Sequence, residues 1–103
     1  MKKAQKQVAQ LMEEHRLMSD PKNRFLDLNS ELGELAKELL KSGEYEEKKI
    51  EITPALTEEL GECVFSLLAL CQSLGLSAEE VFEHAMEKYR LRLAQTGRAD
   101  SGR

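Results

Sequence analysis

Four glutamates in two identical tetrapeptides are the residues of this sequence best suited to chemistry. Glu-Leu-Gly-Glu occurs at 31–34 and again at 59–62. Glutamates three positions apart lie on one face of a helix, about 60° apart around its axis. Carboxylate oxygens with no nitrogen or sulfur partner are the ligands that magnesium and manganese prefer. If the two tetrapeptides lie on neighbouring helices, their carboxylates predict a divalent-cation site.

Each acidic pair borders an apolar stripe instead of lying opposite to it. The two stripes consist of Leu28, Leu32, Leu35 and Leu39, and of Leu56, Leu60, Cys63, Leu67 and Leu70. The leucine inside each tetrapeptide is therefore expected to turn toward the core, with the glutamates facing one another across a groove. Carboxylates gathered there repel one another, and some keep a proton at neutral pH unless a cation neutralises them.

Each tetrapeptide also contains a glycine, Gly33 or Gly61. A glycine inside a helix costs about 1 kcal/mol relative to alanine, and it favours the close approach of another backbone or of a ligand. The alternative interpretation is a solvated face, because helices often expose Glu-x-x-Glu pairs that bind nothing. Two copies with the same internal glycine, on consecutive helices, favour a site.

Four helices are expected to position the two pairs. They should span about residues 3–17, 23–41, 54–74 and 77–95. Ser19-Asp20-Pro21 separates the first two helices, because proline breaks a helix. Thr53 followed by a proline is a typical N-cap for the third. Ser77 and Glu80 form a capping box for the fourth. The charged connector at 43–53 could hold a short extended piece.

The composition predicts one all-α domain, a four-helix bundle at residues 1–95 with a flexible tail at 96–103. Hydrophobic residues make up 41% and charged residues 33%, which is typical of neither a disordered nor a membrane protein. The net charge of −4 argues against nucleic-acid binding, which needs a basic surface. Because no leader or membrane span is recognisable, we expect a cytoplasmic protein. So small a core favours pairing with a second copy.

Several other kinds of site are excluded by residue type and spacing. Cys63 and Cys71 lack the spacing and histidine partners of a zinc site, so we interpret them as reduced core thiols. A di-iron bundle needs Glu-x-x-His, but no glutamate stands three residues before His15 or His84, which we place at the surface. No phosphate-loop motif occurs, and Ser66 has no visible base partner for nucleophilic catalysis.

The order of these motifs resembles the MazG-like nucleotide pyrophosphohydrolases. Arg24-Phe25-Leu26 leads into Glu-Leu-Gly-Glu-Leu-Ala at 31–36, and Glu-Glu-Leu-Gly-Glu follows at 58–62. That family carries Glu-x-x-Glu, a spacer and Glu-x-x-Asp on two helices of an all-α bundle. The resemblance covers about residues 20–95, and the carboxylate pairs are its specific part.

The resemblance implies hydrolysis of a nucleoside triphosphate between the α and β phosphates, dependent on Mg²⁺ or Mn²⁺. Carried over to this sequence, the metal ligands would be Glu31, Glu34, Glu59 and Glu62, with Glu34 accepting the proton of the attacking water. Two positions depart from the family pattern. Glu62 stands where Asp is usual, which alters coordination geometry, and Ser30 stands where relatives often have another acidic residue.

The triphosphate also needs positive partners, for which the sequence offers Lys37 on the second helix, and Lys88 and Arg92 on the fourth. The last two are four residues apart and share a face, although each could equally be an ordinary solvated side chain. Tyr89 or Phe25 could stack on a base, but Phe25 is expected to pack in the core.

The resemblance also implies a homodimer or homotetramer, in which association completes the site. Two other functions fit the same residues. One is a non-catalytic helical module that binds metal or nucleotide, which the Glu62 departure favours. The other is a related hydrolase that acts on a diphosphate or on a phosphorylated metabolite.

Overall fold

The computed structural model describes residues 1–17, 19–42 and 49–97, and this part of the chain contains four α-helices and no strand. The helices are α1 (Lys2–Glu14), α2 (Pro21–Ser42), α3 (Pro54–Ser73) and α4 (Ala78–Thr96). The expected all-α class and the four helices are confirmed. No strand forms at residues 49–53, while most of that connector and most of the expected tail lie outside the described residues.

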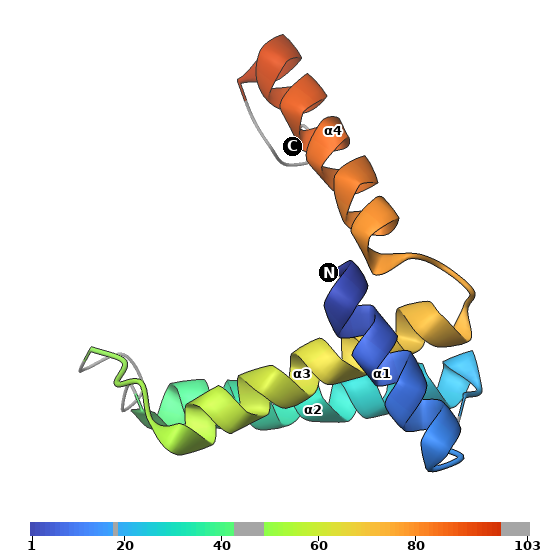
Figure 1. The fold of residues 1–103 in the computed structure, drawn as a ribbon. Helices are drawn as coiled ribbons and strands as arrows, with labels where there is room; N and C mark the ends of the chain where they lie inside the picture. Colours follow the sequence, from blue (N-terminus) through green and yellow to red (C-terminus); the bar gives the residue numbers. More distant parts are fainter. Residues whose placement is uncertain (18, 43–48, 98–103) are drawn as a thin grey trace.

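α2 and α3 lie side by side as an antiparallel pair, and the other two helices are attached to α3 (Figure 1). α1 crosses α3. α4 leaves the end of α3 and projects away from the other three helices (Figure 1). Within one chain, therefore, three helices pack together and the fourth contacts them only near its beginning.

Side-chain caps begin α2 and α3 near the positions that the sequence predicts. At the start of α2, Asp20 Oδ1 accepts a hydrogen bond of 2.9 Å from the backbone N–H of Lys22. At the start of α3, Thr53 Oγ1 accepts one of 3.1 Å from the N–H of Leu56. Both bonds satisfy N–H groups that have no partner within the helix. α2 begins at Pro21, two residues before the expected start.

α1 ends at Glu14, three residues earlier than the sequence predicts. Arg16 adopts the left-handed conformation, with φ of 51°, and the N–H of Leu17 bonds back to the carbonyl of Met12 at 2.9 Å. This is a Schellman ending. It usually requires glycine, and the arginine here gives no such signal in the sequence.

The connection between α3 and α4 ends in the predicted way. Gly75 takes a φ of 71°, which only glycine adopts at little cost. Ser77 then caps α4 by accepting a 3.3 Å hydrogen bond from the N–H of Glu80. α3 and α4 are consequently bent by 102° from one another.

One cluster of buried residues lies mainly between α1 and α3, with the first residue of α4. Its members are Val8, Met12, Leu68, Ala69, Cys71 and Ala78. Cys63 and Cys71 are both buried and not joined to each other, as expected for core thiols, and both histidines are exposed as predicted. Among the described residues, no single helix is long and apolar enough to cross a membrane. Only α3 and α4 taken together have that length and composition, and the bend separates them.

The prediction that Leu32, Leu60 and Phe25 pack in the core is wrong for the single chain. Their exposed fractions are 46%, 52% and 51%. Glu31 and Glu59 occupy the contact between α2 and α3, so the residue after each is turned by about 100° from that contact. In the described part of the chain, that side of the pair leaves all three side chains about half exposed.

The α2–α3 pair therefore has two chemically different sides. In an antiparallel pair, equal steps along the two chains from facing residues lead to the same side. One step from Glu31 and Glu59 leads to the leucines, and three steps lead to Glu34 and Glu62 on the opposite side. One side of the pair is apolar and the other is acidic.

Candidate metal centre

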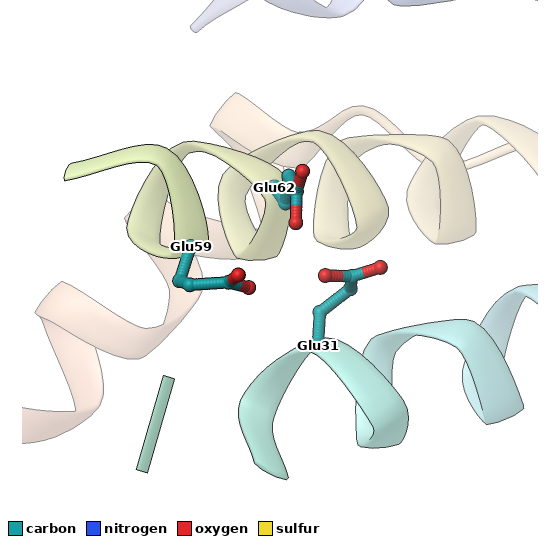
Figure 2. Close-up of side chains that lie close together, drawn as sticks. All are labelled: Glu31, Glu59 and Glu62. Atoms are coloured by element: carbon teal, nitrogen blue, oxygen red, sulfur yellow. The ribbon is translucent and has the colours of Figure 1, made fainter. Parts of the chain in front are cut away.

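Three of the four predicted carboxylates meet between α2 and α3. Glu31 reaches from α2 toward Glu59 and Glu62 on α3 (Figure 2), and each side chain offers a carboxylate oxygen within 4.8 Å of the other two. The antiparallel packing of the two helices brings together residues that are distant in sequence. The prediction that the two tetrapeptides lie on neighbouring helices and face each other therefore matches the structure.

One oxygen at this site is buried without a partner. Glu59 Oε2 is closed off from solvent, and within the described residues it accepts no hydrogen bond. A buried acceptor without a partner is unfavourable, and the native structures of proteins rarely leave one. A bound cation would satisfy this atom, so the donor set fits a metal ion on the basis of its own geometry.

The surroundings of Glu31 raise its pKa. The largest cause is hydrogen bonding with Glu62, which requires a proton on the pair. Burial comes next, followed by the negative charges of Glu62, Glu59 and Asp27. All of these causes favour the neutral form of Glu31 as long as no cation is present.

The pKa of Glu59 is raised as well, first by burial and then by the charge of Glu62 and a hydrogen bond with it. The charges of Glu34 and Glu38 add to the effect. Burial, followed by the charges of the three cluster glutamates, also raises the pKa of the Cys63 thiol. The neighbouring cysteine therefore stays neutral, and the donor atoms of the site are oxygens.

Glu34, the fourth predicted ligand, lies outside the three-carboxylate group. Its side chain is exposed, and Oε2 lies 3.7 Å from Nζ of Lys37 on the same helix. An ion pair this exposed contributes about 0.5 kcal/mol, so it is easily exchanged for another partner. Because its charge reaches Glu59, Glu34 stands at the margin of the site. Lys37 is the one predicted phosphate ligand found there.

Two further carboxylates near the site, Asp27 and Glu38, were not predicted. Together with Glu31 and Glu34 they are spaced four, three and four residues apart, which places all of them along one face of α2. That periodicity was available in the sequence. Asp27 also pairs with the buried Arg24, whose Nη1 lies 4.0 Å from its Oδ2.

Lys88 and Arg92 are not brought to the carboxylates within one chain. Both lie on α4, of which only the first residue is buried, and α4 points away from the α2–α3 pair (Figure 1). The bend after α3 is the physical reason, because it directs α4 outward.

The two glycines are exposed, and within the described residues a Cβ added to Gly33 or Gly61 would meet no atom closer than 4 Å. The close approach of another backbone is therefore not seen in the single chain.

The chain belongs to the MazG nucleotide pyrophosphohydrolase domain family, whose model matches residues 20–96. The matched segment contains α2, α3 and α4, and with them all of the carboxylates described above, whereas α1 lies before it. The chain is also 39% identical over 66 residues to the uncharacterized protein YpjD of Bacillus subtilis (strain 168). That match covers 63% of this chain and 60% of the relative. No solved structure matches the chain.

Proposed function

We propose that this chain is a magnesium-dependent nucleoside triphosphate pyrophosphohydrolase, which cleaves between the α and β phosphates to release the monophosphate and pyrophosphate. Manganese would serve in place of magnesium. The observation that carries the proposal is the buried oxygen of Glu59, which has no partner and faces two further carboxylates. Membership of the nucleotide pyrophosphohydrolase family supports the class of reaction.

Glu31, Glu59 and Glu62 would hold the cation, and Glu34 would join them from the margin of the site. When bound, the cation supplies polarisation of a phosphoryl oxygen and neutralises phosphate charge. Glu34 remains accessible to solvent, so its carboxylate can accept the proton of a water molecule that attacks the α phosphorus. Lys37, which pairs with Glu34 at 3.7 Å, would then be released to bind a phosphate oxygen.

A homodimer or homotetramer is part of the same proposal. Leu32 and Leu60, at the middle of the apolar side of the α2–α3 pair, are about half exposed in the described part of the chain. Burial of this apolar surface between two copies would contribute about 25 cal/mol per Å², and that free energy would drive association. Association could also bring Lys88 and Arg92 of one copy toward the carboxylates of another.

The proposal is tested by measuring pyrophosphate and inorganic phosphate released from a panel of nucleoside triphosphates and diphosphates, with magnesium and with a chelator. The test variant is Glu59→Gln. The matched control is Glu58→Gln, which changes the neighbouring exposed glutamate of the same helix. Pyrophosphate release that needs magnesium, is lost in Glu59→Gln and persists in Glu58→Gln is the expected result.

Other outcomes would select the alternative functions. Inorganic phosphate released from triphosphates without pyrophosphate would indicate cleavage of a different bond, and phosphate released from diphosphates alone would indicate the related hydrolase that acts on a diphosphate. If folded protein releases neither product from any nucleotide, the non-catalytic module becomes the better interpretation.

A further inference from the structure

The direction of α4 is determined at one end of the helix. α4 spans 19 residues, and Ala78, its first residue, is its only buried one. At about 1.5 Å per residue the helix is roughly 28 Å long, so a rotation of about 10° at its base moves the far end by about 5 Å. Whatever fixes the first turn therefore decides where the side chains of the last turns lie.

The side chain of Gln5 on α1 bonds to both sides of the bend between α3 and α4. Its Nε2 donates to the carbonyl oxygen of Leu76 at 2.8 Å and to Oε1 of Gln72 at 3.1 Å. Its Oε1 accepts from the N–H of Ala78 at 2.7 Å. One amide thus joins the last turn of α3, the connection and the first residue of α4.

The polarity of these bonds matches a single orientation of the amide group. The two acceptors face its NH₂ group and the N–H donor faces its oxygen, so the reverse orientation would oppose donor to donor and acceptor to acceptor. The Ala78 N–H is also one of the first N–H groups of α4, which have no partner inside the helix. Gln5 thereby satisfies a second N–H group of the first turn of α4, beside the Glu80 N–H that Ser77 caps.

Two further contacts at the base of α4 also come from α1. Lys2 Nζ lies 3.4 Å from Oε2 of Glu79. Ala78 belongs to the same buried cluster as Val8 and Met12 of α1. The segment that matches the family model begins at residue 20, so all three contacts are made by a helix that lies before it.

We infer that the contacts of α1 hold the base of α4 and that the hydrogen bonds of Gln5 fix the angle at which α4 leaves α3. These hydrogen bonds thereby determine where the cations and apolar side chains of α4 lie relative to the α2–α3 pair. This inference goes beyond the proposed function, because it concerns the orientation of a helix and holds whether or not the chain hydrolyses nucleotides.

The test compares the full chain with Gln5→Ala and with Gln10→Ala. Gln10 is a matched control, because it lies on the same helix and its Nε2 bonds to Glu14 Oε1, within α1 itself, at 3.0 Å. Amide residual dipolar couplings are measured in all three proteins, together with hydrogen exchange of the Ala78 amide. In the wild type and in Gln10→Ala, one alignment tensor should fit the couplings of α3 and α4. In Gln5→Ala, α4 should lose that shared tensor and Ala78 its protection, with helical content unchanged.

A second variant keeps the inference testable if Gln5→Ala folds poorly. Gln5→Glu retains an oxygen acceptor for the Ala78 N–H but loses the donor to Leu76 and Gln72. We expect it to keep Ala78 protected while α4 loses the shared tensor. The inference is overturned if either Gln5 variant leaves the common tensor intact, or if α3 and α4 of the wild type already need separate tensors.

Discussion

Glu31 on α2 and Glu59 on α3 reach toward each other across the antiparallel pair, and with Glu62 they place carboxylate oxygens within 4.8 Å of one another (Figure 2). The charge of Glu59 is among the causes that raise the pKa of Glu31. The ionised form of Glu59 thus disfavours the ionised form of Glu31. A cation bound between them would be attracted by both carboxylates and would remove this repulsion.

Magnesium should stabilise the folded protein through the three-carboxylate group. At a hundredfold excess over the dissociation constant, binding contributes about 2.7 kcal/mol, which corresponds to a rise in Tm of more than about 10 °C for a domain of this size. Thermal unfolding with magnesium and with a chelator measures the rise. Glu59→Gln should abolish it and Glu58→Gln should preserve it. An equal rise in both variants would place the cation elsewhere.

Without metal, replacing Glu59 should stabilise the protein, and the gain should depend on pH. The raised pKa of Glu59 means that the folded state holds its proton more tightly than the unfolded chain does. The stability that this group contributes is fully present below the ordinary pKa of a glutamate, and it is lost as pH rises through the raised pKa of the folded state. The glutamine of Glu59→Gln does not ionise, so this variant does not lose stability in that way as pH rises.

Urea unfolding in chelator, at a series of pH values from 4 to about 8, tests this difference. Glu59→Gln should gain on the wild type as pH rises and then keep a constant advantage. A difference between the two proteins that does not change with pH would contradict the raised pKa of Glu59.

Glu34 and Glu31 should differ in what their replacement removes. Glu34→Gln removes the proposed proton acceptor from the margin of the site, so kcat should fall by about 10²–10⁴-fold while the magnesium-dependent rise in Tm is largely retained. Glu31→Gln removes a member of the three-carboxylate group, so both activity and the rise in Tm should be lost. Steady-state kinetics and thermal unfolding of the same samples make the comparison. Equal losses in the two variants would make Glu34 a ligand of the same rank as Glu31.

The apolar side of the α2–α3 pair should be an interface between copies. Leu32→Glu combined with Leu60→Glu places charge on that side, and the molar mass measured by light scattering should fall to that of a single chain, 11.7 kDa. Leu26→Glu is the control. That leucine is also exposed, but it lies on α2 about 120° around the axis from Leu32. If the wild type already has the mass of one chain, the proposed assembly is wrong.

The sequence predicted the elements whose signals are local. Thr53 and Ser77 cap α3 and α4 with their own side chains, and such caps are recognisable because donor and acceptor lie within three residues. The end of α1 was missed because the left-handed residue is Arg16 instead of a glycine. Glu31, Glu59 and Glu62 were found because helical spacing alone puts each pair on one face.

The remaining features depend on contacts between residues distant in the chain. The direction of α4 rests on Gln5, whose hydrogen-bond partners lie 67 to 73 residues away, and no local pattern encodes that contact. For the same reason the sequence could not show that Lys88 and Arg92 lie away from the carboxylates. Leu32 and Leu60 have the spacing of core residues along their helices. Whether they are buried depends on what packs against the helix pair, which the spacing within one helix does not show.

The two sides of the α2–α3 pair also determine which changes in length the chain tolerates. The side on which a residue of α2 lies depends on its number of residues from the inward-facing Glu31. Inserting one residue before Glu31 within α2 would therefore rotate every preceding side chain of the helix by about 100°. Such an insertion would turn Asp27 away from the side of the pair on which Glu31 and its neighbours gather. Doubling the length of the connector between the helices costs only about 0.6 kcal/mol in closure entropy. Insertions and deletions among relatives should therefore collect in that connector, while the lengths of the two helices around the glutamates stay fixed.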